Sequence, residues 1–113
     1  MKTVLIILYT FITIPITQLI ELNGEQYNSK QYNVYMFGIK HHVKWTKREC
    51  QSVLYHRYWI GMNYWMLVYE RGKPNTITRL NYGDNSEVEY CWYDYTPSCF
   101  YDHDGDDIIN AYK

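Results

Sequence analysis

The chain has 113 residues, a net charge of −1 and 47% hydrophobic residues. This length is typical of one domain rather than several, and the small net charge excludes a uniformly basic or acidic protein. The charge is nevertheless divided along the chain. Nine basic and two acidic residues lie between Lys30 and Arg79, whereas residues 84–113 hold eight acidic residues and one lysine. The two halves either steer charged partners or neutralise each other in the fold.

Tyrosine is unusually frequent, with 14 copies in a chain whose aromatic fraction is 19%. Tyrosine offers a large contact area and a hydrogen-bonding tip, which suits a binding surface. An A/T-rich genome is an equally good explanation, because Tyr, Asn, Ile and Lys have A/T-rich codons.

The N-terminal residues 1–17 have the layout of a secretory signal, with Lys2, an apolar run and then Pro15. The alternative is an uncleaved membrane anchor over residues 4–20, which Pro15 and Gln18 disfavour. A signal predicts a secreted protein, whereas an anchor predicts a single-pass protein with its domain on the exocytic side. Residues 18–30 are predicted to be a flexible mature N-terminus, followed by a single exported domain in residues 31–113.

The first predicted elements are a strand and a helix. Residues 31–39 are rich in strand-forming side chains. The next element, residues 46–60, is predicted to be an amphipathic helix with a Thr46–Glu49 capping box and a C-cap at Gly61. Its apolar face comprises Cys50, Val53, Leu54 and Tyr58.

Strands are predicted next at residues 62–69, 76–82 and 87–95, with a fourth at 99–101. A three-residue loop at 83–85 would pair Leu80 with Val88. The order predicts an α+β domain in which a three- to four-stranded antiparallel meander packs on the helix. An all-β sandwich is the alternative, if residues 46–60 form strand and loop.

One predicted sheet face lies opposite the helix. It carries an apolar patch that would anchor another protein if it is exposed, and that the N-terminal segment or the tail would otherwise cover. The first functional hypothesis is therefore a secreted, non-enzymatic interaction protein. Its predicted partner-binding residues are Trp65, Leu67, Tyr69 and Ile77.

A basic and aromatic cluster precedes the predicted helix. Such a cluster can bind a polyanion through charge and stacking, and a sulfated glycan is the preferred ligand, because an exported protein has little access to nucleic acid. The alternative is a solvated surface that pairs with the acidic tail. The predicted polyanion-binding residues are Lys40, His41, His42, Lys44, Trp45, Lys47 and Arg48.

The three cysteines predict one disulfide in an oxidising compartment. Cys91 and Cys99 enclose a short loop in which Pro97 favours a turn, so these two are the predicted pair. Cys50 is then left buried and free, or available for an intermolecular bridge. A Cys50–Cys99 bridge is the alternative.

Motifs for catalysis or metal binding are weak in this sequence. The carboxylates of residues 102–107 resemble a calcium loop, but Gly105 is fourth rather than sixth and no closing Glu follows. Cys50 and His56 would lie on opposite sides of a helix, and no zinc spacing or Gly-rich phosphate loop is present. The sequence predicts no metal, no cofactor and no enzymatic activity, and a small secreted hydrolase is the third hypothesis.

Overall fold

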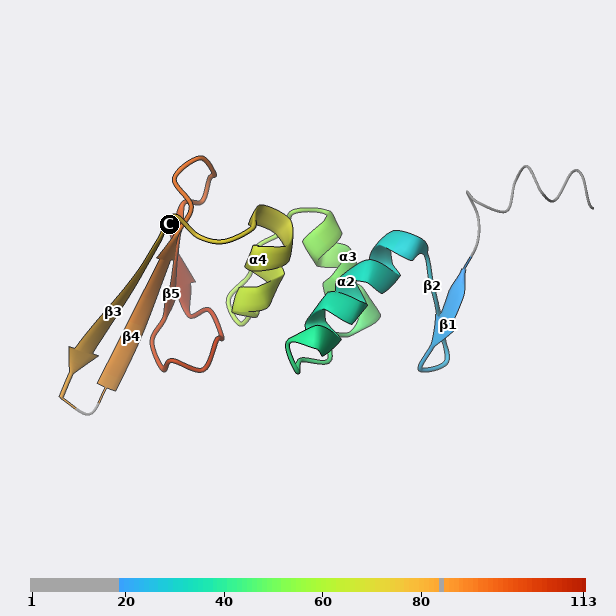
Figure 1. Ribbon diagram of the computed structural model, residues 1–113, viewed down its shortest axis with the longest axis horizontal. Coiled ribbons are helices and arrows are strands. Elements are labelled where there is room, and N and C mark those ends of the chain that lie inside the picture. Colours follow the sequence, from blue (N-terminus) through green and yellow to red (C-terminus); the bar gives the residue numbers. More distant parts are fainter. Residues whose placement is uncertain (1–18, 84) are drawn as a thin grey trace, which may run out of the picture.

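The computed structural model describes residues 19–83 and 85–113, so the predicted signal in residues 1–17 lies outside the described part. The described chain contains a β-hairpin, three helices and a four-stranded antiparallel sheet (Figure 1), which confirms the α+β class. Within these residues no helix is both long and apolar enough to traverse a membrane. The elements are β1 (Ile20–Leu22), β2 (Glu25–Tyr27), α2 (Ser29–Lys40), α3 (Lys47–Leu54), α4 (Tyr64–Arg71), β3 (Thr76–Tyr82), β4 (Asn85–Cys91), β5 (Cys99–Asp102) and β6 (Ala111–Tyr112).

Helix α2 occupies the range predicted as the first strand, so that prediction was wrong. A capping box starts the helix: the Asn28 side chain accepts the Gln31 N–H at 2.8 Å, and the Gln31 side chain accepts the Asn28 N–H at 3.0 Å. Its buried residues, Gln31, Val34, Tyr35 and Gly38, recur at helical spacing. A Cβ on Gly38 would lie 2.8 Å from the Trp45 ring, so glycine is required there.

Helix α3 begins with the predicted capping box, in which Thr46 and Glu49 bond reciprocally at 3.1 and 2.8 Å. Cys50 and Val53 are its buried residues, as the predicted inward face requires. The helix ends at Leu54 with Tyr55 as its C-cap, earlier than predicted, so Gly61 does not cap it.

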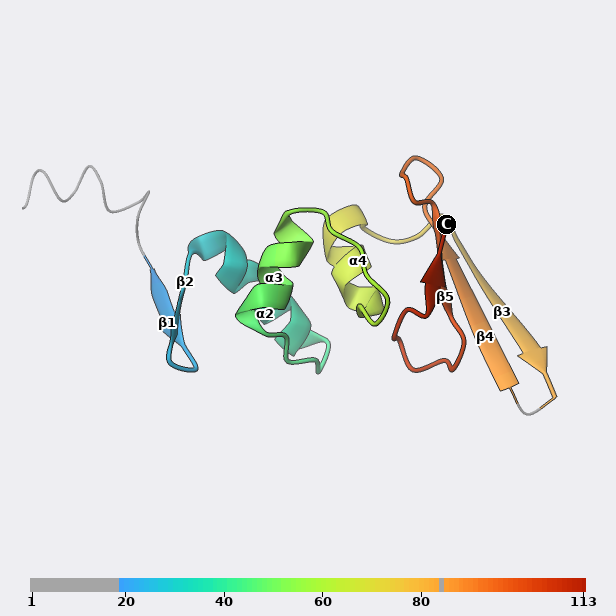
Figure 2. The same ribbon diagram turned by 180° about the vertical axis from the view of Figure 1, so that it is seen from behind.

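Helix α4 replaces the strand predicted at residues 62–69, which was also wrong. The Asn63 side chain accepts the Trp65 N–H at 2.8 Å, and Gly72, at a positive φ of 81°, forms the C-cap. The helix lies between the α2–α3 pair and the sheet in both views (Figures 1 and 2). Because it has neighbours on two sides, it is apolar around most of its circumference.

The sheet has the order β3-β4-β5-β6, and the predicted strands at 76–82 and 99–101 are confirmed. The strand predicted at 87–95 is β4, but it ends at Cys91, so its extension over residues 92–95 was wrong. The predicted register was wrong by one residue, since Leu80 pairs with Glu87 and Arg79 pairs with Val88. Two residues connect the pair Tyr82 and Asn85, rather than the predicted three. A one-residue slip exchanges the two faces of a strand.

The sheet joins the helices through its inner face and one neighbouring segment. Tyr64 of α4 stacks on Tyr90 of β4 with ring centroids 4.2 Å apart. Three backbone hydrogen bonds of 2.8 Å link residues 61–64 to residues 107–109. Trp92, Phe100 and Ile109 are at most 1% exposed, so helices and sheet share one core.

The described part of the predicted flexible N-terminus instead forms the β1–β2 hairpin, in which Ile20 pairs with Tyr27. Tyr27 is 2% exposed and packs edge-on against Tyr35 of α2, with ring centroids 5.8 Å apart. The hairpin is therefore anchored to the helical region by a buried aromatic contact.

Candidate binding groove

An open, mainly apolar groove of about 510 Å³ lies where α2 and α4 meet the start of β3. Its residues come from both helices and the C-cap of α2, from the loop that follows α4 and from the start of β3. They are Phe37, His41, Tyr64, Trp65, Val68, Lys73, Pro74 and Ile77.

Stacked rings form one wall of the groove. The His41 imidazole lies face to face with the Trp65 indole, with centroids 3.7 Å apart and an interplanar angle of 9°. Phe37 packs against His41 at 4.6 Å and against Tyr69 at 5.3 Å. Each ring is held by its neighbours, so this wall is ordered before any partner binds.

The rim of the groove is cationic. Lys73 lines the groove, and Arg79 lies two residues beyond Ile77 on the same face of β3. Burial and the Asp107 carboxylate raise the pKa of Tyr64, and burial and the neighbouring carboxylates raise the pKa of Asp107. The positive charge of Arg79 partly offsets the increase in both pKa values. Arg79 therefore acts electrostatically on the region where α4 meets the sheet.

The structure brings together only some of the predicted partner-binding residues. Trp65 and Ile77 both line the groove, but they come from a helix and a strand rather than from neighbouring strands. Leu67 is 0% exposed and belongs to the core, so its assignment to a binding surface was wrong. Tyr69 is half-buried and supports Phe37 from outside the groove.

Five groove residues were missed: Phe37, Tyr64, Val68, Lys73 and Pro74. They were assigned to strands or to a turn, because the helices that position the groove were not predicted. The Asn28–Gln31 spacing was the available signal, since it is a capping box that marks the start of α2.

The predicted polyanion-binding cluster is divided in space. Trp45 is 3% exposed and packs against Gly38, so its ring cannot stack on a ligand. His41 is part of the groove wall. The remaining members lie away from any exposed aromatic ring of the cluster: Lys40, His42, Lys44 and Arg48 are exposed, and Lys47 is half-buried.

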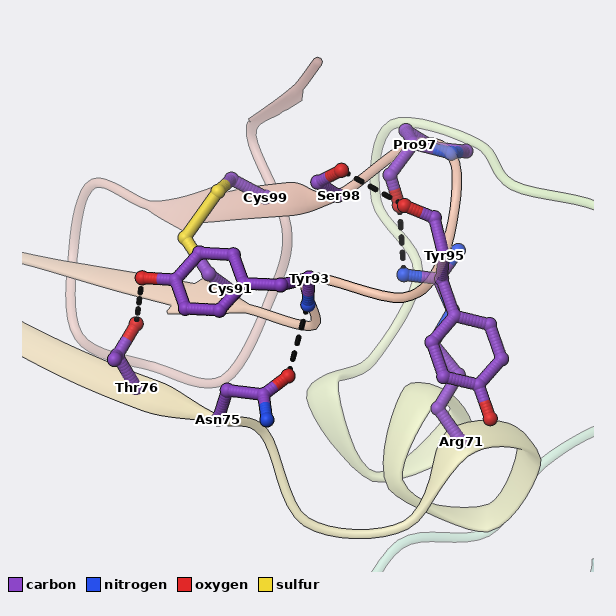
Figure 3. The surroundings of a disulfide bond; sticks show 9 residues. All are labelled: Arg71, Asn75, Thr76, Cys91, Tyr93, Tyr95, Pro97, Ser98 and Cys99. Atoms are coloured by element: carbon purple, nitrogen blue, oxygen red, sulfur yellow. Dashed lines mark hydrogen bonds between the residues drawn. A yellow bond between two sulfur atoms is a disulfide. The ribbon is translucent and has the colours of Figure 1, made fainter.

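A second aromatic cluster, the Arg71 cage, lies between α4 and the sheet. The Arg71 guanidinium lies within 4.8 to 5.6 Å of four ring centroids, and its Nη1 donates to the Pro97 carbonyl at 2.7 Å (Figure 3). The neighbouring Glu70 carboxylate accepts a hydrogen bond from Tyr58 and lies 3.1 Å from His56 Nδ1. The rings of the cage belong to Tyr58, Trp92, Tyr95 and Phe100.

The predicted Cys91–Cys99 disulfide is confirmed, and it joins residues directly opposite each other on β4 and β5 (Figure 3). The loop that it closes is held further by a hydrogen bond of 2.8 Å from the Tyr93 N–H to the Asn75 side chain. Cys50 is free and buried, as predicted. Burial raises the pKa of the Cys50 thiol to about 11, so it stays protonated and unreactive at neutral pH.

The acidic turn at residues 102–107 is organised by its own backbone. Asp102 is 0% exposed, and its carboxylate accepts the N–H groups of the residues at 104, 105, 106 and 107. This carboxylate therefore stabilises a turn. The described residues bring one potential ligand set within 4.8 Å, Glu89 with Cys91 and Cys99, but the disulfide already uses both sulfur atoms.

No protein-family model, curated protein or solved structure matches the chain. The geometry and chemistry of the groove are therefore the features of this chain that bear on its function.

Proposed function

We propose that this protein is an exported, non-enzymatic interaction protein that holds a segment of another protein in the groove between α2, α4 and β3. The observation that carries the proposal is an open, mainly apolar volume of about 510 Å³ with one wall of stacked aromatic rings. Partner side chains that fill such hollows, away from water, provide most of the affinity in protein interfaces.

The groove residues favour binding over catalysis. Among the described residues that line it, none is a serine, a cysteine or a carboxylate. His41 is the imidazole of the groove, and one face of its ring is covered by Trp65. Nucleophilic or acid–base catalysis requires a nucleophile and a base within hydrogen-bonding reach, whereas apolar and aromatic walls suit recognition.

Export is supported by the Cys91–Cys99 disulfide, because disulfides persist in oxidising compartments and are rare in reducing ones. The layout of residues 1–17 as a secretory signal favours the same location. The stacked aromatic wall of the groove provides a preformed surface for such a binding role.

The proposal is tested with linear peptides of about 12 residues, long enough to form a strand, selected by phage display on the purified protein. Ile77→Ser removes a groove side chain that is 47% exposed, and Ile60→Ser is the matched control, because Ile60 is 61% exposed and lies outside the groove. We expect selected peptides to bind the Ile77→Ser variant about ten-fold more weakly than the Ile60→Ser variant. Equal binding to both variants, or no enriched peptide, would contradict the proposed function.

A further inference from the structure

The free edge of the sheet lies beside the groove. Strand β3 has seven residues and pairs with β4 along its whole length, and no other described strand pairs with it. It is the outermost strand in Figure 1. The opposite edge, β6, has only two residues. An edge strand presents unpaired N–H and C=O groups at every second residue, and a long edge accepts another strand.

The edge and the groove meet at Ile77, which belongs to β3 and lines the groove. Helix α4 and β3 thus flank the same hollow. An extended segment placed along β3 would direct every second side chain toward the groove, since side chains alternate between the faces of a strand. In this mode of recognition, the main-chain hydrogen bonds provide affinity and the pocket provides specificity.

We propose that the partner segment binds as an extended strand along the free edge of β3, with one apolar side chain in the groove and one acidic side chain against Arg79. This inference rests on the proposed function and adds the class of partner. Ile77 and Arg79 are two residues apart on one face of β3, so their counterparts on the partner are also two residues apart. The recognised segment therefore carries an apolar residue and an Asp or Glu two positions apart, in either order along the segment.

Charge argues against a second copy of this chain as the occupant. Arg79 is the middle residue of β3, so full antiparallel pairing of β3 with its own copy would place Arg79 opposite Arg79. Like charges at directly opposite positions destabilise a strand pair. Exposed Arg79 on β3 and Lys73 in the groove lining make the same edge attractive to an acidic segment.

Main-chain pairing is tested on the peptides that depend on Ile77, by methylating each backbone nitrogen in turn. A paired strand donates hydrogen bonds at every second residue, so we expect alternate N-methylations to weaken binding about ten-fold or more. The intervening positions should change the affinity less than about two-fold. The protein itself is unaltered here, so no folding defect can produce this pattern.

Charge recognition is tested with Arg79→Glu and a control, Arg57→Glu, at another exposed arginine. We expect only the Arg79→Glu variant to lose affinity, by about ten-fold, and a peptide with Lys in place of its acidic residue to regain it. Two results would overturn strand addition and leave the proposed function intact. The first is an Ile77-dependent peptide whose N-methylation effects do not alternate along the chain. The second is a peptide whose important side chains are three or four residues apart, as on a helix. The absence of any Ile77-dependent peptide would overturn the proposed function itself.

Discussion

The Arg71 cage and the groove are both lined by aromatic rings, but the cage is filled and the groove is open. Both gather aromatic rings around a hollow next to α4. In the cage, a cation of the chain itself occupies the centre, and Arg71 is only 8% exposed. In the groove, the rings of His41 and Trp65 stack face to face, and a hollow of about 510 Å³ lies beside them.

Aromatic content alone therefore does not locate a binding surface in this protein. The cage uses its rings for internal packing, and the Nε1 of Trp92 is also bonded internally, to the Gly72 carbonyl at 2.9 Å. The groove rings have part of their surface uncovered, with nothing from the described chain in the hollow. The cage should therefore determine stability and the groove should determine binding.

Replacing the central cation of the cage should have the largest effect. Arg71→Ala removes its contacts with four rings and leaves the Pro97 carbonyl without its hydrogen bond. We expect the free energy of unfolding to fall by about 3 to 5 kcal/mol, measured by urea denaturation. Arg57→Ala is the control, since Arg57 is exposed and covers one ring, Tyr55, and about 0.5 to 1 kcal/mol is expected. Equal losses in both variants would contradict the assignment of the cage to the core.

Removing the disulfide should have the second largest effect. The disulfide joins residues that are eight apart in the sequence, and the loop between them carries Tyr95 of the cage. For a loop of this length, the double variant Cys91→Ala, Cys99→Ala should lose about 2.5 kcal/mol of unfolding free energy. Its affinity for groove-binding peptides should remain within about two-fold, because the loop contributes no groove residue. A large loss of affinity in the folded variant would show that cage and groove are coupled.

Ile77→Ser should have the smallest effect on stability. Ile77 is 47% exposed, so the change should alter the unfolding free energy by no more than about 0.5 kcal/mol while weakening peptide binding. Thermal and urea unfolding provide the comparison with the unmodified protein. A loss as large as that of Arg71→Ala would mean that the groove is packed as core.

The sheet was largely predictable because its signals are local. Alternating residues at 76–82 and the turn at Gly83 define a hairpin, and the Cys91–Cys99 pairing follows from the short loop between them. The exact register was not predictable, since two- and three-residue connections are both compatible with Gly83. Because of this one-residue difference in register, Ile77 lies on the sheet face that packs toward α4 rather than on the opposite face.

The helices at 29–40 and 64–71 were missed because their aromatic and β-branched residues favour strands in isolation. Their helical state depends on the caps at Asn28 and Asn63 and on tertiary packing. The groove could not be assembled from sequence, since it needs both helices placed beside β3. Trp65 and Ile77 were selected for their apolar character, and the fold brings them together by another route.

If the groove is open to a partner while the cage is filled, the indole N–H signals of Trp65 and Trp92 should respond differently to a bound peptide. A proton–nitrogen NMR titration with a selected peptide should shift the Trp65 indole signal, which a Trp65→Phe variant identifies. The Trp92 indole signal should remain in place, because its N–H is bonded to Gly72 within the cage. A peptide that shifts the Trp92 signal and leaves the Trp65 signal unchanged would show that the cage, and not the groove, is the open site.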